Sequence, residues 1–197
     1  MTWITTTIAL EELDKYPNGE AWTQLSETCL SMLVKFGIKL GLSYQQSEDA
    51  AQETMIRFME LYKAGKFQRG KGGGLRKWVF GISYNVIRDL AKKMPREKLI
   101  ADATTGTTFW GSLEDKDAIE KTYDMEWEKM VLTKCLEHIR RRYPKEEYEA
   151  FVLYALREKS ASEVAKQFDK TENAIYILKH KIIKETRSLT ANFERIE

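Results

Sequence analysis

Two blocks of the chain, residues 44–65 and 75–93, repeat their apolar residues at the spacing of an α-helix. In the first block the repeat consists of Ala51, Met55, Phe58 and Tyr62, and in the second of Leu75, Val79, Ile82, Val86 and Leu90, joined by Trp78. Such a stripe lies on one side of a helix and must be buried against other elements. The two blocks therefore favour an all-α fold built around a shared helical core.

The opposite side of the first block is acidic. Asp49, Gln52, Glu53 and Ile56 recur at helical spacing and face away from the apolar stripe. From the pattern alone, a solvated helix surface is the favoured interpretation. The apolar Ile56 among these polar residues leaves a second interpretation open, in which the surface binds a protein partner.

The second block carries a basic stripe. Lys77, Tyr84, Arg88 and Lys92 share a side of the expected helix, and Asn85 lies next to Tyr84. Basic residues greatly outnumber acidic ones between residues 66 and 98, where Asp89 and Glu97 are the only acids. Cations neutralise phosphates, while an aromatic ring and an amide can stack on or hydrogen-bond to an unpaired base. This stripe predicts a nucleic-acid surface.

Composition excludes several classes of function. The 197 residues carry a net charge of only +2, so the basic character is confined to segments. No stretch approaches the roughly 20 apolar residues of a membrane span, and the first residues lack the apolar run of a signal peptide, which predicts a cytoplasmic protein without membrane insertion. Cys29 and Cys135 are expected to be reduced thiols. The chain lacks a nucleophile elbow, a Walker motif and a metal-ligand cluster, so we expect neither an enzyme nor a cofactor or metal site.

Helices are also expected at residues 8–15 and 21–40. Leu25, Cys29, Met32, Leu33 and Phe36 form the apolar stripe of the longer one, and Gly37 and Gly41 are expected to loosen its end. Ser47 is expected to cap the helix that follows, with Glu48 and Asp49 in its first turn. Pro95 ends the block 75–93. Residues 96–124 then read as an acidic linker, either a disordered tether or a segment anchored by Phe109, Trp110 and Leu113.

A helical pattern returns at residue 125. Ser160 to Glu163 has the spacing of a capping box and starts a short helix, and Thr171 can cap a last helix with Ile175, Leu178 and Ile182 in its core. A short helix, a turn and a longer helix predict a helix-turn-helix. A four-helix interaction domain without DNA binding is the alternative.

The order of these features resembles the extracytoplasmic-function sigma factors of bacterial RNA polymerase. The resemblance rests on the acidic pair Glu48-Asp49 followed by Gln52-Glu53, on Phe67 before a glycine-rich basic loop, on Trp78 in the packing helix, and on Asn85 before its basic end. It implies a region 2 helical bundle at residues 1–95, a linker at 96–124 and a region 4 helix-turn-helix at 125–197. Glu158 and the run Tyr176-Ile177-Leu178 depart from the family's usual residues, so its base preference does not transfer.

The resemblance also assigns roles to residues. Asp49, Gln52, Glu53 and Ile56 would bind the clamp helices of the largest subunit of core RNA polymerase, with a further contact of the protein to the flap of the second subunit. The minus-ten promoter element would be bound by Phe67, Lys77, Tyr84, Asn85, Arg88, Lys92 and Lys93. The minus-thirty-five element would be bound by Thr171, Asn173, Tyr176, Lys179, His180, Lys181 and Lys184. An anti-sigma factor is a further expected partner.

Two other classes of function stay open at this point. A polymerase-independent transcriptional regulator could use the helix-turn-helix alone. Separately, the alternative role of Phe67 is that of a core residue rather than a DNA contact. A DNA-processing enzyme would need a carboxylate or nucleophile set, which we do not find.

Overall fold

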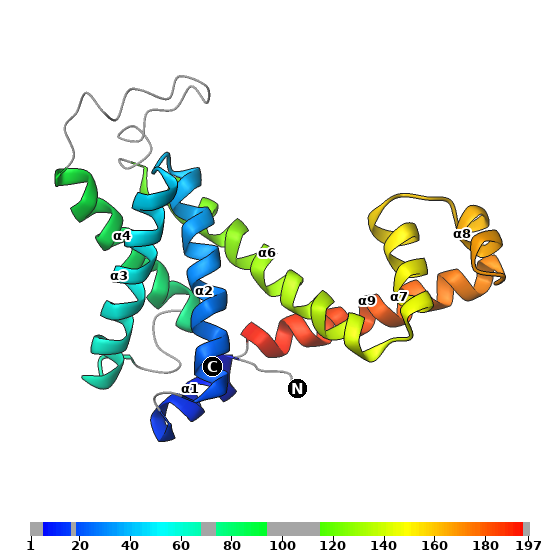
Figure 1. Cartoon of the computed structure of the whole chain (residues 1–197), viewed down its shortest axis with the longest axis horizontal. Helices are drawn as coiled ribbons and strands as arrows, with labels where there is room; N and C mark the ends of the chain where they lie inside the picture. The colour runs from blue at the N-terminus through cyan, green and yellow to red at the C-terminus, as the bar shows by residue number, and fades with distance from the viewer. Residues whose placement is uncertain (1–5, 17–18, 68–73, 94–114, 195–197) are drawn as a thin grey trace. The chain divides into compact units, whose positions relative to one another are not determined.

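The structure, a computed structural model, describes residues 6–16, 19–67, 74–93 and 115–194. The regular elements of these residues are all helical, so the all-α prediction is confirmed (Figure 1). They are α1 (Thr6–Lys15), α2 (Glu20–Lys39), α3 (Tyr44–Lys63), α4 (Gly74–Lys93), α6 (Lys116–Arg142), α7 (Lys145–Phe151), the π-helix η2 (Val152–Leu156), α8 (Ala161–Gln167) and α9 (Glu172–Glu194). Within this part of the chain, every helix is too short or too polar to cross a membrane.

The described residues form two compact units. The first unit ends at Met130, and the second unit runs from Val131 to Glu194, so the boundary falls inside α6. The composition of the chain predicts a linker at residues 96–124 instead. Residues 116–124 differ from that expectation, because they form the first turns of α6. The expected roles of Pro95, Phe109, Trp110 and Leu113 concern residues outside the described ranges.

Helix α2 supplies the centre of the first unit. Its predicted stripe, Leu25, Cys29, Met32, Leu33 and Phe36, is buried along its whole length. The end of α2 is well defined rather than loosened. The N–H of Leu42 donates to the carbonyl of Gly37 at 3.1 Å and that of Gly41 to Ile38 at 2.9 Å, while Gly41 adopts a φ of 93°. This is a Schellman motif, in which a glycine takes the left-handed position.

Helix α3 begins earlier than predicted. Ser43, not Ser47, is its N-cap: the Ser43 hydroxyl accepts the N–H of Gln46 at 3.2 Å, and the Gln46 side chain accepts the N–H of Ser43 at 2.9 Å. Ser47 is fully buried, and its hydroxyl donates to the Ser43 carbonyl at 2.9 Å. Glu48 therefore lies beyond the first turn. The prediction was wrong because the reciprocal partner Gln46 makes Ser43 the better cap.

The first half of α6 completes the core of the first unit. Ile119, Tyr123 and Trp127 are at most 2% exposed. The Tyr123 ring lies 5.3 Å from that of Phe36 in α2 and 5.2 Å from that of Phe80 in α4. Aromatic pairs at these centroid distances stabilise a core beyond the area that they bury. Residues expected in a linker thus belong to the hydrophobic interior.

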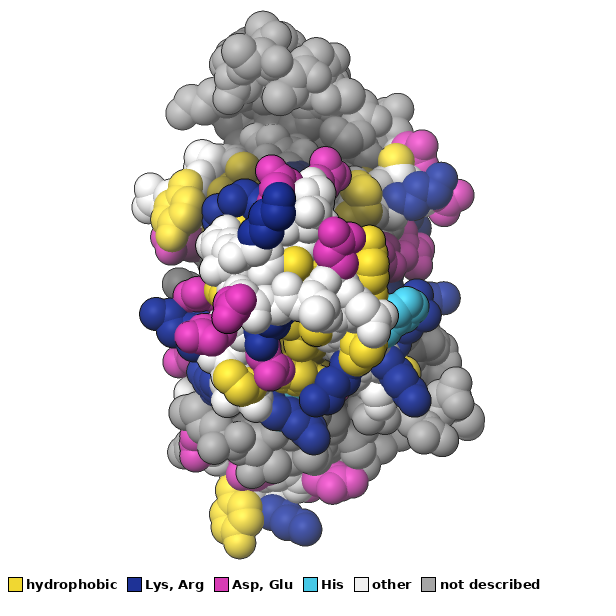
Figure 2. Space-filling model, turned by 90° about the vertical axis from the view of Figure 1, so that its right-hand side faces the viewer, with side chains coloured by type: hydrophobic (Ala, Val, Ile, Leu, Met, Phe, Trp, Pro, Cys, Tyr) yellow, Lys and Arg dark blue, Asp and Glu magenta, His cyan; other side chains and the backbone are white. Residues whose placement is uncertain are grey.

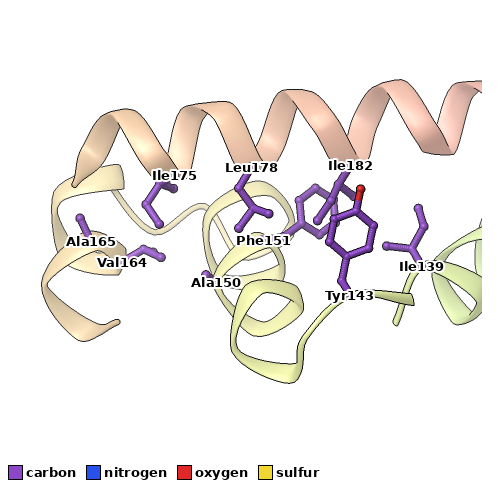
Figure 3. Packing of buried hydrophobic residues seen from close by; sticks show 9 residues of the cluster. All are labelled: Ile139, Tyr143, Ala150, Phe151, Val164, Ala165, Ile175, Leu178 and Ile182. Atoms are coloured by element: carbon purple, nitrogen blue, oxygen red, sulfur yellow. The ribbon is translucent and has the colours of Figure 1, made fainter. Parts of the chain in front are cut away.

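The second unit packs three short helical segments against one long helix. In Figure 3, Ile175, Leu178 and Ile182 of α9 point toward Val164 and Phe151, which come from α8 and α7. The predicted caps are confirmed. The Ser160 hydroxyl accepts the N–H of Glu163 at 3.2 Å while Glu163 accepts the N–H of Ser160 at 2.9 Å, and the Thr171 hydroxyl accepts the N–H of Ala174 at 3.1 Å. Helix, turn and longer helix are present as expected.

A matched pair of glycine substitutions tests the packing of α2 on α3. A Cβ added at Gly37 would lie 2.8 Å from Oγ and 3.0 Å from Cβ of the buried Ser47, whereas one added at Gly81 of α4 meets nothing within 4 Å. We expect Gly37→Ala to lower the free energy of unfolding by about 1–3 kcal/mol, since overpacking a helix contact forces the backbones apart.

Gly81→Ala is the control and should raise the free energy of unfolding by about 0.5–1 kcal/mol, the usual gain for alanine inside a helix. Urea unfolding followed by tryptophan fluorescence measures both variants, because Trp22, Trp78 and Trp127 belong to the first unit. Equal stability of the two variants would contradict the close approach of α2 and α3.

Candidate nucleic-acid interface

The acidic side of α3 is exposed as expected. Asp49 and Gln52 are exposed, Ile56 is 54% exposed, and the Glu53 side chain is 46% exposed. Opposite them, Ala51, Met55 and Phe58 are buried, and Tyr62 is half-buried with its hydroxyl donating to Asp14 at 2.7 Å. The four residues therefore form one outward surface, an acidic face around a single exposed isoleucine. Whether a polymerase binds this face stays a prediction.

A chain of ion pairs connects the acidic face to α4. Arg57 Nε donates to Glu53 at 2.7 Å, and Arg57 Nη1 lies 3.4 Å from Asp89. Asp89 in turn lies 3.8 Å from the Lys92 ammonium. Exposed pairs of this kind contribute little to stability, about 0–1 kcal/mol each. The pairs do, however, orient the side chains that take part in them. Asp89, the lone acid among the described residues of the basic segment, lies between the cations of Arg57 and Lys92.

The predicted basic stripe occupies one side of α4. Lys77, Asn85, Arg88, Lys92 and Lys93 are exposed, and Tyr84 is half-buried. The Tyr84 ring lies 6.0 Å from that of Phe80, with the Arg88 guanidinium 6.0 Å and the Lys116 ammonium 5.8 Å from its centroid. These cations are at the outer limit of a cation–π contact. Tyr84 thus forms the apolar base of the stripe rather than a freely projecting side chain.

Two residues near the stripe are bound within the first unit. Phe67 is half-buried, with its ring 4.7 Å from Trp78 and 6.0 Å from Tyr62, as the alternative interpretation of a core residue requires. Its contact with DNA stays a prediction, and residues 68–73 of the glycine-rich loop lie outside the described residues. Arg76 Nε donates to Asp124 of α6 at 2.7 Å, and Arg76 Nη2 to Glu128 at 3.2 Å. Arg76 is therefore a structural cation.

Helix α9 presents a basic outward side. Thr171, Asn173, His180, Lys181 and Lys184 are exposed, and Tyr176 is 43% exposed. Ile177, which is not among the predicted site residues, is 60% exposed. An open depression on this side is lined by Ile177, His180, Lys181, Ile183, Lys184 and Arg187. Figure 2, seen from the right-hand side of Figure 1, shows basic, acidic and hydrophobic side chains intermixed on the face that is turned to the viewer.

Tyr154 in the π-helix η2 braces the flank of α9. Its ring lies 5.7 Å from that of Tyr176, and the Lys179 ammonium lies 4.8 Å from its centroid. Lys179 is only half-exposed as a result. No pattern in the sequence points to this contact, because a π-helix inserts an extra residue into a turn and shifts every later side chain around the axis.

Tyr143 braces α9 from its other side. The Tyr143 hydroxyl donates to Glu185 at 2.8 Å, Arg142 Nη1 lies 2.9 Å from the same carboxylate, and the Lys181 ammonium lies 5.1 Å from the Tyr143 ring. Burial, together with the hydrogen bond to Glu185, raises the pKa of Tyr143 from its ordinary value of 10.0 to about 12. The neutral phenol is therefore the form that the fold favours.

The structure thus gathers the predicted residues into separate surfaces. The first unit carries the acidic face of α3 and the basic stripe of α4, and the second unit carries the outward side of α9. Among the described residues, no group of three His, Cys, Asp or Glu side chains is placed to hold a metal ion. Chemically, the α4 and α9 surfaces can neutralise phosphates and offer amide, imidazole and apolar groups to base edges.

The pH dependence of stability tests the Tyr143 contact. An unfolded chain loses its tyrosine protons near pH 10, whereas Tyr143 in the fold keeps its proton until about pH 12. The contribution is complete below pH 10 and is lost between pH 10 and 12, so the free energy of unfolding should fall by up to about 2–3 kcal/mol in that window. Tyr143→Phe should fall less steeply, since the other tyrosines titrate equally in both proteins. Parallel curves from urea unfolding would contradict this assignment.

In comparisons with known proteins, no family model matches this chain, and no curated protein matches it.

Proposed function

We propose that this chain is a sigma factor of the extracytoplasmic-function type, which binds core RNA polymerase and directs it to promoters. The observation that carries the proposal is the way in which α9 packs after α8. Helix α9 follows α8 after the turn 168–171, its apolar side is filled by Ile175, Leu178 and Ile182, and its opposite side is basic and exposed. In helix-turn-helix proteins the second helix enters the major groove and its cations contact the flanking phosphates.

The first unit supports the other half of the proposal. The acidic face of α3 repels phosphates, so in the proposal it does not contact DNA itself. The face of Asp49, Gln52, Glu53 and Ile56 is suited to a protein partner with basic and apolar groups, and the clamp helices of the polymerase are the partner that the family resemblance implies. In the proposal, the α4 stripe of Lys77, Asn85 and Arg88 binds the minus-ten element.

Opening the duplex requires no hydrolysis by this protein. A flipped base costs a few kcal/mol of stacking and pairing, and contacts to the extruded base offset that cost. In the proposal Asn85 makes such a contact, which its exposure beside Tyr84 supports.

Run-off transcription with bacterial core polymerase tests the proposal. Purified chain is added to core polymerase over a pool of genomic fragments, and new transcript starts are mapped. We expect starts that depend on the added chain and that share two upstream elements. A lack of new starts together with a lack of a complex with core polymerase would reject the proposal, and would leave a polymerase-independent regulator as the account of α9.

A pair of substitutions on α3 tests the polymerase surface. Ile56→Arg places a cation at the centre of the acidic face and should weaken binding to core polymerase at least tenfold, or about 1.4 kcal/mol, since a central apolar contact is replaced by a charge. Leu61→Arg is the control, because Leu61 is 37% exposed on the same helix but turned away from that face. Equal affinities of the two variants for core polymerase would remove this face from the interface.

A substitution on α9 tests the phosphate contacts. Lys184→Ala should weaken DNA binding alike for all sequences and reduce the slope of log affinity against log salt concentration by about 0.9, the value for one phosphate contact. Lys35→Ala, which removes an exposed lysine of α2, serves as the control for loss of charge. An unchanged salt slope for Lys184→Ala, measured by fluorescence anisotropy on duplex DNA, would exclude a phosphate contact.

A further inference from the structure

Ile177 stands at the centre of the outward side of α9. Asn173 precedes it by four residues and His180 follows it by three, which places all three on one side of the helix. Ile177 is 60% exposed, while its neighbour Leu178 is 8% exposed and belongs to the core. The helix begins at Glu172, so Asn173 and Ile177 lie in its first two turns. These turns are the part of a recognition helix that reaches base edges.

The neighbours of Ile177 on the Tyr176 flank are held by the protein itself. Tyr176 packs edge-on against Tyr154, and the Lys179 ammonium lies over the same ring. Both residues are among the predicted DNA contacts. The brace draws them toward η2, and Ile177 is left as the apolar side chain that projects between Asn173 and His180. A single exposed isoleucine is common on protein surfaces, so its position, not its exposure, is the informative fact.

The side chains around Ile177 suit an apolar contact with a thymine base in the major groove of duplex DNA. Lys184 is exposed two turns further along α9, where it can contact a phosphate, and Lys181, whose ammonium lies 5.1 Å from the Tyr143 ring, is exposed one turn further. In the major groove, the C5-methyl of thymine is the apolar group that a base edge presents, and apolar side chains cover it. The amide of Asn173, one turn before, has the donor and acceptor that pair with adenine N6 and N7.

We propose that Ile177 is a specificity-determining residue that reads the C5-methyl group of a thymine in the major groove. The inference rests on the proposed function, because it requires α9 to enter DNA. It adds what the family resemblance does not provide, a base preference. The bound element should contain a thymine under Ile177 and an adenine within reach of Asn173.

Replacement of thymidine by deoxyuridine gives a direct test, since their bases, thymine and uracil, differ only in that methyl group. The full chain, alone and with core polymerase, is first used to select binding sites from a pool of random duplexes. Each thymine of the selected site is then replaced by deoxyuridine, and affinities are measured by fluorescence anisotropy. We expect one replacement to weaken binding about fourfold, the factor that corresponds to the burial of one methyl group.

Variants of Ile177 complete the cycle. Ile177→Ala should bind the thymine and deoxyuridine duplexes equally, whereas Ile177→Val keeps a branched apolar side chain and should keep most of the difference. Leu156→Ala is the matched control, because Leu156 is 52% exposed in η2 and lies off α9. It should discriminate like the unaltered protein. A merely structural role of Ile177 would change both affinities alike and leave their ratio unchanged.

The outcomes separate this inference from the proposed function. A selected site whose affinity is insensitive to every deoxyuridine, or an Ile177→Ala variant that still discriminates, overturns the role of Ile177 while α9 remains a DNA-reading helix. A pool without enrichment overturns the DNA-reading role of α9 and this inference with it. Binding to core polymerase, measured separately, tests the other half of the proposed function.

Discussion

The first unit depends on the contacts of the buried Tyr123 ring. The ring lies between Phe36 of α2 and Phe80 of α4, at centroid distances of 5.3 and 5.2 Å. An aromatic side chain removes roughly 150–250 Å² from water, which is a large share of a small core. The contact also fixes the rotation of α4, because Phe80 must face inward. The basic stripe, whose Tyr84 ring lies 6.0 Å from that of Phe80, therefore owes its direction to a residue of α6.

Charges reinforce the same contact. Glu126 is 5% exposed, with the Lys39 ammonium at 2.6 Å and the Lys129 ammonium at 3.1 Å. Burial alone would raise the pKa of this carboxyl, but the two lysines lower the pKa on balance. Losing one partner of such a pair leaves an uncompensated buried charge. Glu126 thus ties α6 to the end of α2 and fixes which side of α6 enters the core.

Helices that carry a clear apolar stripe could be predicted from the sequence. The start of α6 could not, because its few apolar residues are buried against helices that are distant in the sequence. Asp117, Glu120 and Asp124 make the start of α6 hydrophilic, and Ile119 and Tyr123 find their partners in distant helices. On α9, helical spacing predicted which residues are exposed, as for Asn173 and Lys184. It could not predict that Tyr154 holds Tyr176 and Lys179, because the π-helix changes the spacing that the prediction assumes.

The position of the unit boundary has a consequence for how such chains can be recombined. Composition changes at residues 95 and 124. A crossover at residue 95 would separate Phe36 and Phe80 from Tyr123, and one at residue 124 would separate them from Trp127. Either crossover would combine two halves of the core that do not fit each other. A crossover after Met130 keeps that core in one piece. The exchangeable module at the C-terminal end is accordingly shorter than its sequence suggests. Any residue between 116 and 130 is inherited with the helices of the first unit.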